Sequence, residues 1–404
     1  MKNSEDDENP TLFSDKQKAE KLNQYFQSIS SIDDKITVMP LFDKRTNSIL
    51  DHVTIEVNEI SDVIKCLHLK KASGPDNISH KLLKKLANSI SIPLCMLFNQ
   101  SLVDSIYPTV WKKANVMPLF KKGDPSKASN YRPISLISCI GKVFERVMFK
   151  HLYNYFLTNQ LLYKYQSGFQ RGHSTVHQLI EIYDQICTAI DDKKYYCMFF
   201  CDVSKAFDRV WHKGLLLKLE RYGIQGPLLH WLADYINNRS QSVFVNGALS
   251  KPRYLQAGVP QGSVLGPFLF LVYVNDIADN LDCLTRLFAD DSSLGLSSHD
   301  QLFIERELNS NLSRLSAWAK RWLITYNPDK TEAIIFSLQK NVDALDLCFN
   351  NVGVKFVNNH KHLGLTFSSD CKWNQHIHKF NKNNFKDDMF FKKAQVLINS
   401  LCSE

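Results

Sequence analysis

The sequence lacks several features that would place it in a specialised class of protein. It has ten cysteines in 404 residues, but no two of them are separated by two residues, and the closest pair is Cys197 and Cys201. This spacing gives no zinc-finger signature and no disulfide framework. Cysteines scattered in this way are typical of reduced thiols in an intracellular protein.

Long hydrophobic runs are also missing. The longest uncharged apolar stretch, VLGPFLFLVYV at residues 264–274, is too short to span a bilayer. Residues 1–10 hold four acids and one lysine, which excludes a secretory signal at that end. We also find no internal repeat and no long linker. These absences predict a protein of the nucleus or cytoplasm without a membrane segment.

The net charge is positive. It is +8 for the whole chain and −3 for residues 1–10, so the remaining residues carry +11. A basic body favours an anionic partner, with nucleic acid first among the candidates. Charge that serves only solubility explains the same excess equally well.

Apolar periodicity and turn residues predict helices and short strands mixed in an α+β manner. Residues 1–15 are expected to be disordered, and residues 376–404 to be helical at best. The main expected helices are 15–30, 56–72, 78–106, 139–162, 174–193, 212–223, 226–238, a long apolar helix within 260–281, and 305–324. A hairpin is expected over 111–138, a buried strand over 195–201, a second hairpin over 240–259 with its turn at Asn246–Gly247, a strand–turn–strand over 285–297, and short strands at 333–337, 347–351, 354–358 and 363–368.

Three aspartates are the strongest chemical signal. Asp290 and Asp291 stand side by side between two apolar segments, so both are expected at the tip of a tight turn. Asp202 falls where the buried strand ends. Two strands that bring acidic ends together would hold divalent cations for phosphoryl transfer, since carboxylates are ligands for Mg²⁺ and Mn²⁺. A solvated acidic turn is the simpler reading of the Asp290–Asp291 pair alone.

Two further segments are weaker signals. The stretch AGVPQGSVLGP, residues 257–267, is a glycine-containing loop that opens a helix, so bare backbone and a helix N-terminus suit a phosphate there. Lys121, Lys122 and Arg132 flank the turn of the first hairpin, where a guanidinium would clamp a triphosphate. An ordinary loop and a solvated basic turn account for these segments at least as well.

A third spacing suggests a metal site that we do not favour. His173, His177 and Glu181 recur every four residues, which would place three ligands on one helical face. No fourth ligand lies nearby, and such spacings arise often by chance.

Taken together, these segments resemble the reverse transcriptases of non-LTR (LINE-type, jockey-like) retrotransposons. FCDVSKAFDRV, GVPQGSVLGP and FADD resemble three successive palm motifs of that family, and NPDKTEAIIF resembles the motif that follows them. KKASGPDNIS, NYRPISL and SGFQRGHST resemble fingers segments in order, and HLGLTF resembles the strand after the palm. The resemblance covers residues 17–378. Its weight lies in the number of motifs in the right order, because no single one decides it.

The resemblance implies an α+β right-hand polymerase. The expected parts are helical and β-hairpin fingers, an antiparallel palm sheet flanked by helices, and a partial thumb. In residue ranges these are a disordered acidic segment at 1–15, a helical extension at 16–100, the reverse transcriptase domain at 101–368 and a shortened thumb or tail at 369–404. The implied function is RNA-directed DNA polymerisation by two-metal phosphoryl transfer.

The resemblance also assigns the catalytic residues. Asp202 and Asp290 would bind two Mg²⁺ ions, with Mn²⁺ as an alternative, and Asp291 would support them. The main-chain carbonyl of Val203 would be a further ligand. Lys330 would protonate the pyrophosphate leaving group.

The remaining roles concern substrates, namely an RNA template, a DNA primer and deoxynucleoside triphosphates. Arg132 would hold the incoming triphosphate, with Lys122 a weaker candidate. Phe207 would be the steric gate that excludes a 2′-hydroxyl. Gln261 and Gly262 would pack against the nascent base pair.

The sequence departs from the family at both ends. No endonuclease precedes the polymerase segments, and the tail after Trp373 matches poorly. We therefore expect a truncated copy or a fragment that does not retrotranspose independently. The alternative function is an inactive remnant that only binds RNA. A group II intron-type maturase is less favoured, because the tail does not resemble a maturase domain.

Overall fold

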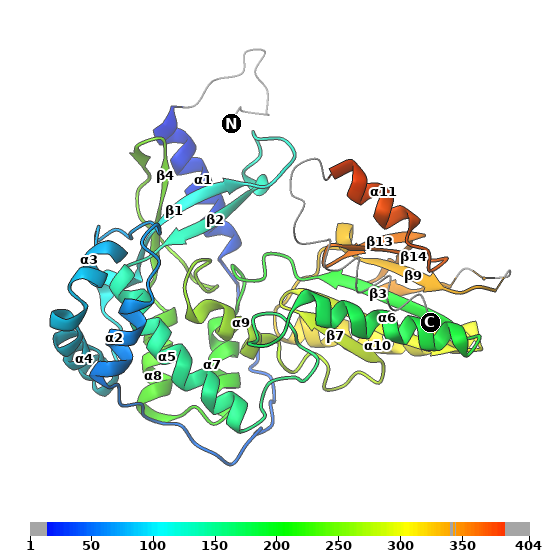
Figure 1. Cartoon of the computed structure of the whole chain (residues 1–404), viewed down its shortest axis with the longest axis horizontal. Helices are drawn as coiled ribbons and strands as arrows, with labels where there is room; N and C mark the ends of the chain where they lie inside the picture. The colour runs from blue at the N-terminus through cyan, green and yellow to red at the C-terminus, as the bar shows by residue number, and fades with distance from the viewer. Residues whose placement is uncertain (1–13, 340–341, 344, 384–404) are drawn as a thin grey trace. The chain divides into compact units, whose positions relative to one another are not determined.

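The computed structural model describes residues 14–339, 342–343 and 345–383 (Figure 1). Disorder was expected at residues 1–15. Residues 1–13 and the helix expected beyond 383 lie outside the described residues, but the expectation is wrong for Ser14 and Asp15, which cap and begin a helix. Helices and strands mix in an α+β manner, as predicted. The chain forms two compact units that each draw on separate segments. The first unit comprises the described residues up to Phe169, with Val203–Asp279 and Trp318–Thr325, and the rest forms the second unit.

The first unit contains helices and a sheet. Its helices are α1 (Asp15–Ile29), α2 (Val57–Lys65), α3 (His80–Lys85), α4 (Ala87–Val103), α5 (Cys139–Thr158), α7 (His212–Arg221), α8 (Gly226–Ile236) and α9 (Leu265–Val274). Its strands are β1 (Lys113–Phe120), β2 (Tyr131–Leu136), β4 (Ser240–Val245), β5 (Ala248–Leu249) and β6 (Arg253–Tyr254).

The sheet of the first unit is built on the predicted hairpin. β1 and β2 pair antiparallel, with Phe120 opposite Tyr131. The predicted second hairpin turns at Asn246–Gly247, where φ is 45° and 89°, as a tight two-residue turn requires. β1 also pairs in parallel with β4, which was not predicted. Periodicity identifies strands, but it carries no information on pairing between segments so far apart in the chain.

Helix α1 covers one face of this sheet (Figure 1). Its N-terminus is fixed by a capping box in which the Ser14 hydroxyl accepts from the Gln17 N–H. Its apolar stripe packs on the two central strands, and the buried members of this cluster are Ala19, Leu22, Phe26, Val116 and Val243.

The second unit contains the other strands. Its strands are β3 (Tyr195–Asp202), β7 (Leu284–Phe288), β8 (Asp291–Ser298), β9 (Glu332–Phe336), β10 (Cys348–Phe349), β11 (Val352–Gly353), β12 (Lys355–Phe356), β13 (Asn359–His362) and β14 (Leu365–Ser368). Its helices are α6 (Thr175–Asp191), α11 (Asn374–Asn383) and α10 (Gln301–Arg321), whose last residues belong to the first unit.

The main sheet of the second unit has the order β12-β9-β3-β8-β7. β3 is central and pairs antiparallel with both β8 and β9, and β7 pairs antiparallel with β8. The antiparallel sheet that was expected therefore holds for these four strands. The exception is the short edge strand β12, which runs parallel to β9.

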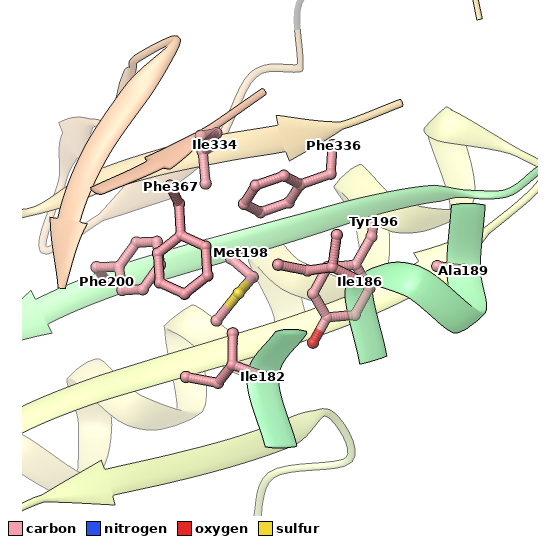
Figure 2. Packing of buried hydrophobic residues seen from close by; sticks show 9 residues of the cluster. All are labelled: Ile182, Ile186, Ala189, Tyr196, Met198, Phe200, Ile334, Phe336 and Phe367. Atoms are coloured by element: carbon pink, nitrogen blue, oxygen red, sulfur yellow. The ribbon is translucent and has the colours of Figure 1, made fainter. Parts of the chain in front are cut away.

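Helix α6 packs on one face of this sheet (Figure 2). Ser174 caps its N-terminus as predicted, since its hydroxyl accepts from the His177 N–H. β3 is buried along its whole length, and its side chains alternate between the two faces. The buried cluster that joins α6 to the sheet consists of Ile182, Ile186, Ala189, Tyr196, Met198, Phe200, Ile334, Phe336 and Phe367.

In the part of the chain that the structure describes, no helix combines the length and the apolarity that crossing a bilayer requires.

Candidate active site

The second unit brings Asp202 and Asp291 together. Asp202 is the last residue of β3, as predicted from the end of the apolar run, and it is buried. Asp291 is the first residue of β8 and lies directly opposite Asp202 in the antiparallel register. Residues directly opposite each other on adjacent strands present their side chains on the same face of the sheet. The two carboxylates therefore share one face at one end of the sheet.

The hairpin β7–β8 differs from the expectation in one respect. Only Asp290 lies in the turn, whereas Asp291 already belongs to the strand and Phe288 pairs with it. The two-residue turn consists of Ala289 and Asp290, and Ala289 has a left-handed φ of 56°. A residue with a Cβ is strained in that conformation. Asp291 therefore lies at the strand position facing Asp202, one place beyond the predicted tip of the turn.

The carboxylates affect each other electrostatically. Partial burial, together with the negative charges of Asp290 and Asp202, raises the pKa of Asp291 to about 7. Both effects disfavour the ionised form. The positive charge of Lys330 opposes these effects at Asp291. Its Nζ donates a hydrogen bond to Oδ2 of Asp202 over 2.7 Å. The main chain holds this lysine close, since the Asn327 N–H donates to the Asp202 carbonyl over 2.9 Å and Lys330 ends the next 3₁₀ turn.

The donor set at this end of the sheet fits a divalent cation. Carboxylate oxygens are the ligands that Mg²⁺ and Mn²⁺ prefer, and a cation would relieve the repulsion that raises the pKa of Asp291. Among the described residues, no group of three or more His, Cys, Asp or Glu side chains is gathered closely enough to hold a metal by itself. Asp202 and Asp291 would therefore serve as two of the protein ligands of such an ion.

The remaining predicted site residues belong to the first unit. Val203 follows Asp202 directly in the chain and is buried. Phe207 is half-buried and stacks on Phe270, with ring centroids 5.2 Å apart, while Phe169 meets it edge-on. These two contacts restrict the rotation of the Phe207 ring.

The loop before α9 uses its glycines to approach other main-chain segments. Gly258 and Gly262 have φ values of 90° and 130°. A Cβ on Gly262 would lie 2.5 Å from the Ser135 carbonyl oxygen, and one on Gly258 would lie 2.7 Å from the Asp208 carbonyl oxygen. The expected benefit of bare backbone was the close approach of a ligand. In the structure these two glycines permit close packing of the loop against its own protein.

Arg132 lies on β2, next to Pro133, and its side chain is exposed. Lys122 follows β1 in the turn of the hairpin and is also exposed. Both are therefore accessible to an anion. The helical face considered for a metal does not form, because His173 precedes α6 and Glu181 forms an ion pair with Arg286 over 2.9 Å.

Two buried carboxylates around the loop were not predicted. Asp208 contacts the side chain of Gln261, and Glu145 accepts hydrogen bonds from the N–H groups of Val264 and Leu265 at the start of α9. The only sequence signal for Asp208 was a charge directly after Phe207. Glu145 had none, because a single acid in an amphipathic helix is ordinary.

Comparison with known proteins covers the whole segment that holds these residues. The family model described as "Reverse transcriptase (RNA-dependent DNA polymerase)" matches residues 119–367, which include every predicted site residue. The probable RNA-directed DNA polymerase from transposon BS of Drosophila melanogaster is 38% identical over 294 residues, 70% of this chain and 32% of that protein.

Two further relatives from the same organism are similar over a larger share of the chain. The RNA-directed DNA polymerase from mobile element jockey is 31% identical over 81% of this chain and 36% of its own length. The probable RNA-directed DNA polymerase from transposon X-element is 32% identical over 79% of this chain and 36% of its own length. The chain thus spans about a third of the length of these relatives. It belongs to the reverse transcriptase family, among the enzymes of non-LTR retrotransposons.

Proposed function

We propose that this chain is an RNA-directed DNA polymerase that adds deoxynucleotides to a primer 3′-hydroxyl on an RNA template. The observation that carries the proposal is the pairing of Asp202 with Asp291 at the ends of two adjacent strands, with Asp290 in the turn beside them. Family membership supports it, and so do the relatives, whose names describe RNA-directed DNA polymerases.

In this proposal Asp202, Asp290 and Asp291 hold two Mg²⁺ ions, and the carbonyl of Val203 completes the protein ligands. When bound, the cations would lower the pKa of the primer hydroxyl and would neutralise charge on the departing pyrophosphate. Lys330 supplies a proton to that leaving group. Its distance of 2.7 Å from Asp202 supports this role, because it places an ammonium beside the carboxylates.

The residues of the first unit act on substrates. Arg132 binds the triphosphate of the incoming nucleotide, and Lys122 contributes a second positive charge. The Phe207 ring, restricted by its aromatic neighbours, excludes a 2′-hydroxyl. Gln261 and Gly262 contact the nascent base pair. We assign residues 101–368 to fingers and palm, residues 16–100 to a helical extension, and residues from 369 to the thumb.

Primer extension tests the proposal directly. Poly(rA) annealed to oligo(dT) is offered with dTTP and Mg²⁺ to the wild type, to Asp202→Asn and to Asp290→Asn. Asp192→Asn is the matched control, because Asp192 precedes the opposite end of β3 and is exposed. We expect extension by the wild type and the control, and a loss of at least about 100-fold in the two other variants.

A folded wild type that extends no primer would overturn the proposal. Salt-sensitive RNA binding by the same preparation would then support the alternative function, an inactive remnant that retains its RNA-binding surface. Melting curves of all four proteins show whether each one is folded before activity is compared.

A further inference from the structure

Asp208 is a buried carboxylate that the proposed chemistry does not use. Its relative exposure is 7%, and it lies in the turn after β3, directly after Phe207. Nε2 of Gln261 lies 2.9 Å from its Oδ1 and 2.8 Å from its Oδ2. Among the described residues it forms no salt bridge, so its principal partner is a neutral amide.

The main chain around this contact is held in place on both sides. The Val259 N–H donates to the Phe207 carbonyl over 2.7 Å, and the Gly258 N–H donates to the Val210 carbonyl over 2.8 Å. The Ser135 N–H donates to the Gln261 carbonyl over 2.7 Å. These bonds fix the backbone of Gln261 but leave its side-chain torsions undetermined. The contact with Asp208 fixes the side chain.

The chemistry of the pair selects one orientation of the amide. An ionised carboxylate only accepts hydrogen bonds, so Gln261 must present its NH₂ group to Asp208. Its Oε1 is then directed away, and in the described part of the chain this oxygen accepts no hydrogen bond. A neutral partner with both a donor and an acceptor would allow the amide to flip.

Burial of this charge is unfavourable for an ordinary structural contact. Desolvation raises the pKa of Asp208 to about 6, in spite of the bond from Gln261 and the charges of Lys205 and Lys121. A neutral side chain of the same shape would hold an amide without that desolvation penalty. What a carboxylate adds is the fixed orientation of the amide.

We propose that Asp208 is a positioning residue, which holds the Gln261 amide so that its Oε1 is presented as a hydrogen-bond acceptor to the incoming deoxynucleotide. The donors on that ligand are its sugar hydroxyl and the N–H groups of its base. The inference rests on the proposed polymerase function, in which Gln261 contacts the nascent pair.

A double-mutant cycle tests the inference. The KM for dTTP and the kcat are measured for the wild type, Asp208→Asn, Gln261→Ala and the double variant on the same primed template. We expect Asp208→Asn to raise the KM about tenfold, as the loss of one oriented hydrogen bond would do, with kcat changed less than threefold. The double variant is expected to match Gln261→Ala alone, because the two residues act through one contact.

Glu145→Gln is the matched control. Glu145 is also buried and also supports this loop, but through the main chain at Val264 and Leu265 rather than through Gln261. Its KM is expected to stay within twofold of the wild type. An unchanged KM in Asp208→Asn, or effects that simply add in the double variant, would overturn the inference. A wild type without any extension would instead refute the proposed function.

The wild-type chain offers a second readout that needs no change at Asp208. Below pH 6 the protonated carboxyl can donate, and the amide loses its single orientation. The KM of the wild type is expected to rise between pH 7.5 and pH 5.5 more than the KM of Gln261→Ala, which also corrects for titration of the nucleotide. An equal rise in both proteins contradicts the inference.

Four other charged or titratable groups act on Asp208 or line the same pocket, and each has to be considered in the pH comparison. Lys205 and Lys121 lower its pKa, and Arg239 and His212 line the same pocket. Burial lowers the pKa of His212, whose Nε2–H donates a hydrogen bond to the Gly258 carbonyl over 2.8 Å. His212 is present in both proteins of the comparison, so its titration does not create a difference between them.

Discussion

At the scale of single residues, Asp208 makes a prediction about stability that is opposite to its predicted effect on activity. Its pKa in the folded protein is about 6, against an ordinary value of 3.8. A raised pKa means that the protonated form favours folding below pH 4, and that this contribution is lost as the pH rises through 6. The free energy of unfolding of Asp208→Asn is therefore expected to exceed that of the wild type at pH 8 by up to about 3 kcal/mol. Urea unfolding measures this difference.

The comparison at pH 4 is the control for this prediction. There the wild-type carboxyl is mostly protonated, and the two proteins should have nearly equal unfolding free energies. A variant that is less stable than the wild type at pH 8 would show that the bond to Gln261 outweighs the desolvation of the charge. Asp208 would then be explained as a structural residue.

Lys330 allows a test that separates charge from proton transfer. Arginine at this position keeps a positive charge beside Asp202 but does not release its proton, because its pKa lies above 12. If Lys330 acts as an acid, Lys330→Arg and Lys330→Gln should both reduce the rate of single-nucleotide addition by about 100-fold. If only its charge matters, Lys330→Arg should retain most of the rate, which rapid-quench measurements of the first addition would show.

At the scale of elements, local signals were sufficient where the chain interacts with its near neighbours. The Ser174 cap, the turn at Asn246–Gly247 and the end of β3 at Asp202 are confirmed. The predicted position of Asp291 at the tip of the turn was wrong by one residue, because alanine is not expected to adopt the left-handed backbone conformation that Ala289 has. The contact of Asp208 with Gln261 was missed, because it joins two loops whose proximity depends on the whole fold.

The β7–β8 hairpin predicts a coupling between pH and metal binding. Asp291 has a pKa of about 7 without a cation, and only its ionised form is a ligand. Mg²⁺ should therefore raise the melting temperature at pH 8 and have little effect at pH 6. Without metal, the protonated carboxyl of Asp291 stabilises the folded protein, and this contribution is lost as the pH rises through 7. The metal-free protein should therefore melt at a lower temperature at pH 8 than at pH 6.

Scanning calorimetry with and without Mg²⁺ measures both effects. Asp291→Asn should abolish most of the shift caused by Mg²⁺ at pH 8, and Asp192→Asn should leave it unchanged. A shift of the same size in the wild type and in Asp291→Asn would place the binding of the cation elsewhere in the protein.

At the scale of the whole molecule, the sequence predicted the α+β class and the family, but not how the chain divides into compact units. The first unit takes Trp318–Thr325 from the end of α10, and the second takes Gln170–Asp202 from between two parts of the first. The parallel pairing of β1 with β4 is equally non-local. Such arrangements depend on which buried faces fit together, and a pattern of apolar residues does not specify this.

The excess of positive charge leads to the last prediction. Outside residues 1–10 the chain carries a net charge of +11, so RNA should bind mainly through its phosphates and release counterions. The dissociation constant for single-stranded RNA should then rise at least about tenfold between 50 mM and 200 mM salt.

The variant Asp290→Asn separates RNA binding from catalysis. It removes one negative charge beside the other catalytic acids, so it should bind RNA no more weakly than the wild type while failing to extend a primer. Fluorescence anisotropy with a labelled RNA measures both proteins. Loss of RNA binding in the variant would mean that the turn of the hairpin supports the binding surface, so its loss of extension would no longer identify Asp290 as a metal ligand.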